Sequence, residues 1–409
     1  MGKNITKPTS VPRYKILFLV SAYPTKNHPV KGIFIKRHAE AIAKFCDVIV
    51  LYITEDSHLR NKTYELNYSV ENGIPTVRVY HRNIKKLPII YGLQKDLIYI
   101  IAARIGFKTI KKRFGKPDIV HANIIEPAGK IAIILKFLHK IPFLITEHSS
   151  SFLPACGKYK RTQTLQKFFT KLVVKNAEAV ITVSSALKNA MLSLGLKNQY
   201  FVVPNVVEVN TTSTIHRLKT RKKKILHISL ILERSKNITG ILKSLYNVIH
   251  NRKRDDFELH IIGEGKDTEK IKNLSIQLNL YNRYVFFEGM KHPEDVYQYL
   301  QEADFLITNS NYETFSVVTA EALACGIPVI ATKCGGPEDF VTEETGILIE
   351  PGNEKQLGDA IIYMLDNSDK YEKRKLMEYA NKRFNSFTVG RQFYEIYEKI
   401  LFNLKRVEH

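Results

Sequence analysis

Tryptophan is absent from this chain, and sulphur-containing residues are few. The 409 residues include no tryptophan, five methionines and four cysteines. No two cysteines form a C-x-x-C pair, so the sequence predicts neither a disulfide scaffold nor a zinc site and favours a reducing compartment such as the cytoplasm. Because tryptophan for base stacking and a recognised nucleic-acid-binding motif are both missing, we do not expect a nucleic acid as partner.

Long apolar runs are absent as well. No stretch of 18 apolar residues occurs, so we expect no transmembrane helix. The first residues, MGKNITKPTSVPRYK, lack the apolar core of a secretory signal, and this favours a cytoplasmic protein. With 409 residues and 44% hydrophobic content, the chain is long enough to bury a sizeable core in about two domains.

Acidic residues are scarce in the first half of the chain only. Residues 1–210 hold 33 basic and 12 acidic residues, a balance of +21, whereas residues 211–409 hold 29 and 28, a balance of +1. General solubility does not require this asymmetry, so we infer that the first half faces a polyanion, with an anionic membrane surface favoured over nucleic acid. The basic, aromatic-containing segment 85–114 is the candidate membrane-facing helix, although a solvated helix face has the same pattern.

The most informative stretch is NSNYETFSVVTAEALACGIPVIATKCGG, residues 309–336. Apolar residues at helical spacing predict a helix from about Thr314 to Ala324, which the following glycine and proline would end. β-Branched residues then predict a strand over 328–332. This alternation of loop, helix and strand is typical of an α/β protein.

Two carboxylates, Glu313 and Glu321, mark the predicted helix. Eight residues of helical rise span roughly 12 Å, which exceeds the roughly 5–9.5 Å between the carboxylates of a glycosidase pair. The spacing suits two ends of one elongated ligand, with a diphosphate bound between them by free amides at the helix start. Those amides are predicted next to Thr314, at Phe315, Ser316 and Val317. The alternative is an ordinary helix-dipole partner and a solvated carboxylate.

Polar residues end two predicted strands in the first half. His121 and Asn123 end the strand 117–124, and Glu147 and His148 end the next strand. Ligands of open α/β sheets bind beyond the carboxyl ends of the strands. These residues are therefore candidates for a substrate site, although a lone histidine is more often a packed structural residue.

Glycines follow predicted strands in both halves. Gly32 precedes a helix predicted over 33–45, and Gly263 and Gly265 follow the strand FELHII. A glycine in a strand-to-helix loop lets a phosphate or a nucleotide approach the backbone. A plain turn glycine is the alternative, because G-x-G alone is a weak signal.

The polar, basic stretch 210–223 has no hydrophobic periodicity and is predicted as a linker. It separates an N-terminal domain, residues 1–209, from a C-terminal domain, residues 224–386. The predicted fold class is α/β, with two Rossmann-like domains.

The stretch 309–336 resembles the E-x7-E signature of the family 4 retaining glycosyltransferases. That family has a pattern of roughly S-x-x-E-x-F-x-x-x-x-x-E-A-x-A-x-G-x-P-V-I-A-T-x-x-G-G. This chain matches the pattern at Ser310, Glu313, Phe315, Glu321, Ala322, Ala324, Gly326, Pro328, Val329, Gly335 and Gly336. The resemblance implies the GT-B fold, in which two Rossmann-like domains face each other across a cleft and the C-terminal helix, here residues 387–409, crosses back to the first domain.

The resemblance also implies roles for individual residues. Glu313 would contact the donor sugar, Glu321 the nucleotide ribose, and His148 the sugar near the reacting centre. His121 and Asn123 would lie on the acceptor side.

The expected diphosphate-binding loop departs from the family pattern. Family members have G-R-L-x-x-E-K-G there, with the arginine and lysine on the diphosphate. Lys236 matches the lysine, Leu230 stands where the arginine is expected, and Arg234 is the candidate to supply the missing charge. Backbone at the three glycines would line the donor site: Gly32, Gly263 and Gly265.

The sequence thus predicts a retaining glycosyltransferase that moves a hexose-type sugar from a nucleotide-diphosphate sugar to a glycan or lipid-linked acceptor. We expect no metal, because no D-x-D motif occurs, and no cofactor. Peripheral attachment to the inner face of the membrane, in surface polysaccharide or glycolipid synthesis, fits the basic half. The alternatives are a GT-B-like sugar-nucleotide epimerase, a polyanion-binding protein without activity, and an inactive scaffold.

Overall fold

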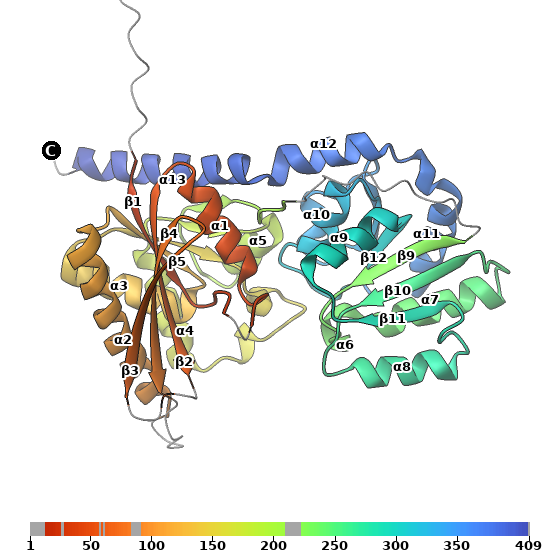
Figure 1. Ribbon diagram of the computed structural model, residues 1–409, viewed down its shortest axis with the longest axis horizontal. Coiled ribbons are helices and arrows are strands. Elements are labelled where there is room, and N and C mark those ends of the chain that lie inside the picture. Colours follow the sequence, from red (N-terminus) through yellow and green to blue (C-terminus); the bar gives the residue numbers. More distant parts are fainter. Residues whose placement is uncertain are drawn as a thin grey trace, which may run out of the picture. The chain divides into compact units, whose positions relative to one another are not determined.

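The computed structural model describes residues 13–25, 28–56, 59, 62–82, 91–208 and 222–407. Strands and helices alternate along most of the chain (Figure 1). The strands are β1 Lys15–Val20, β2 Asp47–Asp56, β3 Tyr64–Glu71, β4 Ile74–Arg82, β5 Ile119–Asn123, β6 Phe143–Glu147, β7 Val180–Thr182, β8 Tyr200–Val202, β9 Lys223–Ile228, β10 Phe257–Ile262, β11 Val285–Gly289, β12 Phe305–Thr308, β13 Val329–Thr332 and β14 Gly346–Ile349. The α-helices are α1 Ile33–Ala43, α2 Tyr91–Phe114, α3 Lys130–His139, α4 Thr164–Asn176, α5 Ser185–Ser193, α6 Glu233–Lys236, α7 Ile238–His250, α8 Thr268–Gln277, α9 Pro293–Glu302, α10 Val317–Ala324, α11 Glu354–Asn367, α12 Lys373–Phe384 and α13 Ser386–Val407.

The first sheet has eight strands in the order β3-β4-β2-β1-β5-β6-β7-β8. β1 pairs in parallel with β2 on one side and with β5 on the other. β2 also pairs in parallel with β4, and β5 pairs in parallel with β6. Consecutive residues of β1 and β5 are buried, as expected for parallel strands covered on both faces. β3 runs antiparallel to β4 and meets it at Asn72-Gly73, where both residues have positive φ. The sequence analysis did not predict β3.

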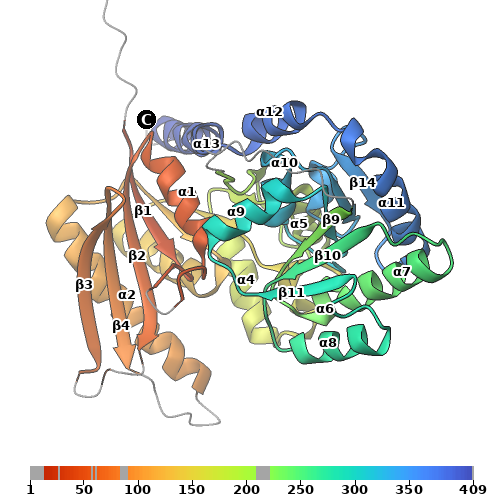
Figure 2. The same cartoon turned by 45° about the vertical axis from the view of Figure 1, so that its right-hand side comes forward.

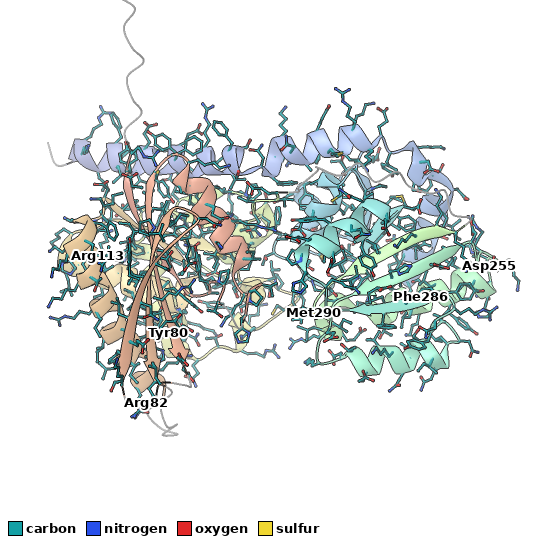
Figure 3. All side chains as sticks on the ribbon, viewed as in Figure 1. Tyr80, Arg82, Arg113, Asp255, Phe286 and Met290 are labelled. Atoms are coloured by element: carbon teal, nitrogen blue, oxygen red, sulfur yellow. The ribbon has the colours of Figure 1, made fainter. Side chains whose placement is uncertain are left out.

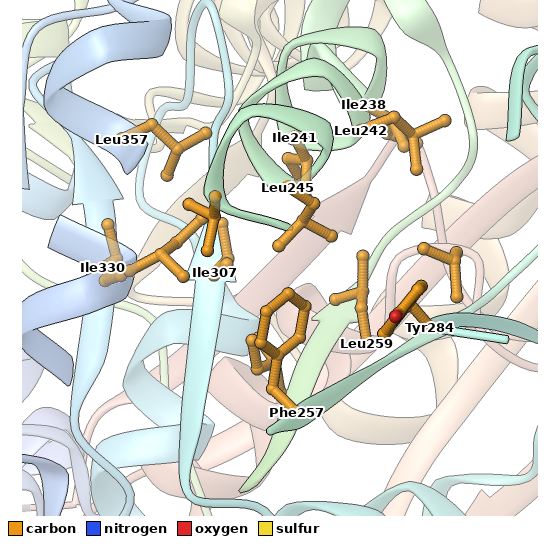
Figure 4. Close-up of a cluster of buried hydrophobic side chains, with 14 of the residues drawn as sticks. Ile238, Ile241, Leu242, Leu245, Phe257, Leu259, Tyr284, Ile307, Ile330 and Leu357 are labelled. Carbon is orange, nitrogen blue, oxygen red and sulfur yellow. The ribbon is translucent and has the colours of Figure 1, made fainter. Parts of the chain in front are cut away.

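The second sheet has six strands in the order β11-β10-β9-β12-β13-β14, and its recorded pairs are parallel. α7 buries Ile238, Ile241, Leu242 and Leu245, which share one helix face, against strand residues such as Phe257 (Figure 4). α7 and α11 pack against each other beside this sheet (Figure 2). The core therefore supports the loops at the carboxyl ends of β9, β10 and β12.

Contacts group the chain into two compact units. Unit 1 contains Met1–Thr146, Leu172–Val180 and Gly390–His409, and unit 2 contains Glu147–Lys171 and Ile181–Val389. The predicted α/β class is confirmed. Most of the predicted linker lies outside the described residues, so the predicted domain boundaries stay a prediction.

The C-terminal helix α13 packs into unit 1. The Tyr397 hydroxyl is hydrogen-bonded to His121 Nδ1 at 2.6 Å, and the rings of Phe393 and His38 meet edge to face with their centroids 5.0 Å apart. A Cβ on Gly390 would stand 2.2 Å from the Ala41 carbonyl oxygen, so α13 and α1 are in close backbone contact. The predicted return of the C-terminal helix to the first domain is therefore confirmed.

Three predicted elements differ from the structure. α10 begins at Val317 and not at Thr314, because Ser316 has a left-handed backbone, with φ 70°. The stretch TGILIEPGN, residues 345–353, is predicted from the sequence as a hairpin-like closing element, but its strand β14 pairs in parallel with β13. α2 begins at Tyr91, and residues 85–90 of the predicted basic segment lie outside the described residues. Within the described ranges, none of the helices is long and apolar enough to cross a membrane.

Candidate active site

Lys236 and Glu313 meet in unit 2, although 77 positions separate them in the sequence. The Lys236 ammonium donates a hydrogen bond to Glu313 Oε1, and Ser310 Oγ donates to the same oxygen at 2.9 Å. Lys236 ends the single-turn helix α6, and Glu313 lies in the loop between β12 and α10. The two side chains are 21% and 15% exposed. The pair is thus partly shielded from water, which strengthens its electrostatic interaction, but a ligand can still reach it.

The backbone around Glu313 is fixed by a second loop. The Glu313 N–H donates to the Cys334 carbonyl at 3.1 Å, and the Gly336 N–H donates to the Glu313 carbonyl at 3.0 Å. A Cβ on Gly336 would stand 2.3 Å from the Cα of Phe315, and one on Gly335, with φ 129°, would stand 2.5 Å from the Glu313 carbonyl oxygen. Only glycine allows this approach, so the glycine pair holds the candidate sugar-binding carboxylate in place.

Free backbone amides lie at the start of α10. The Ala320 N–H donates to the Ser316 carbonyl at 3.3 Å, whereas no acceptor among the described residues is recorded for the N–H groups of residues 315–319. Ser316 Oγ and Thr319 Oγ1 are hydrogen-bonded at 2.7 Å. The N–H groups of Phe315, Ser316 and Val317 are thus among the unbonded amides, and their contact with a diphosphate stays a prediction. The first turn of the helix is 317–319, and Thr314 to Ser316 form the turn before it.

The side chain of Phe315 is part of the core. It is 2% exposed and packs against Phe340 and Phe384. Only its backbone is therefore available to a ligand.

Glu321 lies in the second turn of α10 and is half-buried. The interval from Glu313 to Glu321 is helical only from Val317 onward. The sequence-based separation of roughly 12 Å assumed eight residues of helical rise, and that assumption is wrong. One turn later, burial raises the pKa of the Cys325 thiol to about 12, and the Glu321 charge adds to the effect.

Gly263 and Gly265 bring two strand-end loops into contact. A Cβ on Gly263 would stand 1.9 Å from the Ser229 carbonyl oxygen, and one on Gly265 would stand 2.2 Å from the Ile231 carbonyl oxygen. The Ser229 N–H donates to the Ile262 carbonyl at 3.0 Å. The loop after β9 thus packs directly on the loop after β10, which explains both glycines without a ligand. Their contact with a nucleotide stays a prediction.

Arg234 is tied to the loop that follows His148. Its Nη2 donates to the Cys156 carbonyl at 3.0 Å, and its own carbonyl accepts a hydrogen bond from Asn311 Nδ2 at 3.0 Å. Leu230, where the family has arginine, is 58% exposed. Because a guanidinium carries five N–H donors, Arg234 keeps donors beyond the one bound to Cys156, and its diphosphate role stays a prediction.

Glu147 holds the turn that carries His148. Its Oε1 accepts the N–H groups of His148 at 2.8 Å and Ser149 at 2.7 Å. The Glu147 side chain is fully buried, and His148 is 7% exposed. From the sequence, Glu147 is predicted only to end a strand. A carboxylate directly before a polar turn is a known local cap for free amides, and this signal could have revealed its positioning role.

His227 is a second residue that the sequence analysis missed. It is 1% exposed at the end of β9, with Nδ1 2.9 Å from the Ile307 carbonyl and Nε2 2.8 Å from Ser229 Oγ. Since a carbonyl only accepts, Nδ1 carries the proton and Nε2 accepts from the Ser229 hydroxyl. Burial, with a smaller effect of Lys236, lowers the pKa of His227 to about 4. This neutral histidine anchors the loop on which Gly263 packs.

Three predicted site residues lie in unit 1. His121 is fully buried, with Nδ1 bonded to Tyr397 and Nε2 2.6 Å from Thr146 Oγ1. Burial and the nearby His38 lower its pKa well below the usual value. Both ring nitrogens are occupied, so this geometry favours the packed structural histidine that the sequence left open.

Asn123 and Gly32 are the other two predicted site residues in unit 1, and neither has the fully bonded side chain of His121. Asn123 is fully buried, and its Oδ1 has no hydrogen-bond partner among the described residues, so it could accept a bond from a ligand. Gly32 precedes α1 with φ 70°, and a Cβ there would stand 2.6 Å from the Ala22 carbonyl carbon. The close approach of these two backbone segments requires glycine.

Across the described part of the chain, no group of three or more histidine, cysteine, aspartate or glutamate side chains could hold a metal ion.

Two family descriptions match this chain. Glycosyltransferase Family 4 covers residues 32–211, and Glycosyl transferases group 1 covers residues 208–384. An uncharacterized glycosyltransferase of Methanocaldococcus jannaschii is 28% identical over 337 residues, which cover 80% of this chain and 88% of the relative. A putative teichuronic acid biosynthesis glycosyltransferase of Bacillus subtilis is 24% identical over 367 residues, which cover 85% of this chain and 88% of the relative.

A solved structure shows the same fold. The Anabaena protein HepE in complex with UDP superposes with a TM-score of 0.69 at 18% sequence identity, covering 94% of this chain and 100% of HepE.

Proposed function

Because this chain belongs to the family 4 glycosyltransferases, which have the GT-B fold, we propose that it moves a hexose-type sugar from a nucleotide-diphosphate sugar to a glycan or lipid-linked acceptor. We propose further that the reaction retains the anomeric configuration. The Bacillus subtilis relative, a putative teichuronic acid biosynthesis glycosyltransferase, supports a place in surface polysaccharide or glycolipid synthesis. The UDP bound to HepE supports a nucleotide-diphosphate donor.

One observation carries the proposal: Lys236, from α6, pairs with Glu313, and Glu313 lies in the loop that leads directly to the unbonded amides at the start of α10. A helix start offers N–H donors and the positive end of the helix dipole to a diphosphate. Lys236 adds a full positive charge, and Glu313 offers a carboxylate to sugar hydroxyls. Glu321, further along the same helix, would accept hydrogen bonds from the ribose.

The proposed reaction takes place on one face of the sugar. The bond from the anomeric carbon to the leaving phosphate oxygen breaks, the acceptor oxygen bonds to the same carbon, and the acceptor's proton passes to the departing phosphate. Lys236 and the amides would stabilise the charge that develops on the diphosphate. Glu313 and His148 would orient the sugar, with the His148 turn held by Glu147. The positive charge comes from the protein itself, so the proposal needs no metal or cofactor.

Unit 1 supplies a candidate membrane-facing surface. The α2 residues Leu97, Ile100 and Ile101 are 58%, 36% and 38% exposed, and the α3 residues Phe137 and Leu138 are 59% and 72% exposed. The basic side chains exposed along α2 are Lys95, Arg104, Lys108, Lys111, Lys112 and Arg113. Figure 3 labels Arg113, near the end of this helix. We propose that these two helices contact anionic lipids, because apolar side chains beside lysine and arginine suit a charged bilayer surface.

The two helices form one continuous surface. The Lys130 ammonium is 3.0 Å from Asp96 Oδ2, and the rings of Phe107 and His139 are 4.8 Å apart. Each contact joins α2 to α3, the first near their beginnings and the second further along. The α3 contribution was not part of the sequence-based expectation, which named only the segment 85–114.

A thermal-shift screen of nucleotide diphosphates and nucleotide-sugars tests the donor proposal. One donor should raise the melting temperature, and product analysis with that donor alone should give no epimer. Stabilisation by no member of the panel, or conversion of the donor into an epimer without an acceptor, would contradict the proposal.

Glu321→Ala tests the ribose assignment. We expect its affinity for the stabilising nucleotide diphosphate to fall about tenfold, because a hydrogen bond to a charged group is lost. The control is Glu378→Ala on α12, an exposed carboxylate paired with Arg374, which should leave the affinity unchanged. Equal affinities in the two variants would contradict the assignment of Glu321 to the ribose.

A further inference from the structure

A cavity of about 260 Å³ lies just beyond the turn that carries His148. Its walls come from two 3-10 turns, Ser150–Phe152 and Tyr159–Arg161, and from the C-terminal end of α5. Most of its lining side chains are apolar or aromatic, and they include Phe152, Leu153, Pro154, Tyr159 and Leu194. Small-molecule sites have this character, with apolar walls and a few polar groups that orient the ligand.

Apolar surface continues outside the cavity. Leu165 and Phe168 on α4 are 59% and 58% exposed, and Leu192 on α5, next to the lining residue Ser193, is 37% exposed. The Lys167 ammonium donates to the Lys160 carbonyl at 2.7 Å, so the first turns of α4 lie against the turn Tyr159–Arg161 that forms one wall. Exposed apolar groups gathered around an apolar cavity mark an interaction site for an apolar ligand.

Positive charge surrounds the same region. Residues 148–177 contain six basic residues and no acidic residue. Lys160 lines the cavity, is exposed, and forms no ion pair with any described residue. An apolar cavity with an unneutralised ammonium at its edge matches an amphiphile with an apolar chain and an anionic head. A soluble glycan has no chain to fill such a cavity.

We propose that this cavity binds the lipid chain of a phosphorylated lipid acceptor and that Lys160 contacts its phosphate. The inference rests on the proposed transferase function and names the acceptor class for it. The turn holding His148 ends where the cavity begins, so a lipid held there would present its head group beside the predicted sugar-binding histidine. The exposed apolar side chains on α4 and α5 would cover the part of the chain that extends beyond the cavity.

The missing tryptophan provides a direct assay in the full-length protein. Ser193→Trp creates the single tryptophan of the chain on the cavity wall, so its emission reports on this site alone. The probes are farnesyl phosphate, farnesol and inorganic phosphate, each below the concentration at which it aggregates. We expect a saturable blue shift with farnesyl phosphate, about tenfold weaker binding of farnesol, and no shift with inorganic phosphate.

Two variants in this background locate the contacts. Lys160→Gln should weaken farnesyl phosphate binding about fivefold and leave farnesol binding unchanged. Leu194→Phe, which fills part of the cavity, should weaken both lipids. The matched control is Lys382→Gln, an exposed lysine on α12 that does not line the cavity, and it should change neither.

Equal binding of farnesol and farnesyl phosphate, or equal effects of Lys160→Gln and Lys382→Gln, would overturn the proposal, as would the lack of saturable binding. The nucleotide screen on the same preparation separates this failure from a failure of the proposed function. Nucleotide binding without farnesyl phosphate binding overturns the lipid site only. Absence of both overturns the transferase proposal as well.

Discussion

In the candidate site, charged side chains form ion pairs and hydrogen bonds with one another in the protein without a ligand. The Lys236 ammonium is bonded to Glu313, whose carboxylate also accepts from Ser310. A diphosphate at the start of α10 would compete for Lys236, because a phosphate offers several anionic oxygens to one ammonium. Binding of the donor would then release Glu313 for the sugar. Lys236 thus has a different partner in the free protein from the one expected in the reaction.

Lys236→Ala should lower turnover much more than donor affinity. Removing a group that stabilises the developing charge typically costs about 10²–10³ in kcat, whereas the α10 amides remain to bind the diphosphate. Steady-state kinetics and nucleotide titrations measure the two effects separately. Lys243→Ala, which removes an exposed ammonium 3.5 Å from Glu354, is the control and should behave as the parent protein. A variant that binds nucleotide poorly but keeps its kcat would contradict this role.

Protonation of His227 should make the protein less stable in mild acid. The pKa is about 4 in the folded protein and 6.5 for the unperturbed group, so the unfolded chain takes up a proton first as the pH falls below about 6.5. The stability that depends on a neutral His227 is therefore complete above pH 6.5 and is lost progressively toward pH 4, by about 3 kcal/mol in total.

His227→Asn tests this effect, since its amide can still donate to Ile307. The melting temperature of the parent should exceed that of the variant at pH 7.5, and the gap should shrink as the pH falls from 6.5 to 5. A constant gap for His227→Asn would rule out the linkage.

The sequence predicts the candidate site residues that belong to a local pattern and does not indicate those that depend on distant partners. Glu313 and Lys236 could be found because each stands in a motif, whereas their ion pair joins α6 to a loop 77 positions away. His227 depends on burial beneath Ile307 and Ser229, which no neighbouring residue of the chain indicates. His121 looked like a ligand at a strand end because its partner, Tyr397, is 276 positions distant.

At the scale of elements, the strands of both sheets were largely predictable, because buried parallel strands are continuous apolar runs. The start of α10 was not, since Phe315 and Ser316 have acceptable helix propensity and their residue types do not indicate the left-handed backbone of Ser316 that delays the helix. β3 was missed although Asn72-Gly73 is a strong hairpin signal, because its alternating residues are mostly polar or exposed. The pairing of β14 depends on β13 and the crossover between them, which pattern alone does not specify.

Gly263→Ala should destabilise unit 2. The residue has φ 122°, and its Cβ would stand 1.9 Å from the Ser229 carbonyl oxygen, so the two loops must separate at a cost on the order of 2–4 kcal/mol. Gly358→Ala is the control, because Gly358 lies within α11 and its Cβ would have only Val248 nearby, at 3.8 Å. That change should be neutral or stabilise the protein by up to about 1 kcal/mol. Equal melting temperatures for both variants would contradict the packing argument.

At the scale of the molecule, the uneven charge predicts salt-sensitive membrane binding. The full-length protein should sediment with anionic liposomes at low ionic strength and be released at about 1 M salt, where the Debye length is about 3 Å. Phe137→Ser combined with Leu138→Ser should weaken binding about tenfold or more, because about 1.5–3 kcal/mol is at stake for each apolar side chain that inserts fully.

Ile276→Ser on α8, which removes an apolar side chain that is 52% exposed, should leave liposome binding unchanged. Equal binding by neutral and anionic liposomes would remove the electrostatic part of the proposal. Unchanged binding of the α3 variant would remove α3 from the surface.

The C-terminal helix has a consequence for how the protein is made. Unit 1 includes both β1 and the segment that begins at Gly390. Within it, Nδ1 of the buried His121 is hydrogen-bonded to the Tyr397 hydroxyl. The ribosome adds Tyr397 276 residues after His121, so the interior of unit 1 can close only after this later segment has been synthesised. Removing the final twenty residues would therefore leave an open, aggregation-prone first half and not simply a shortened tail.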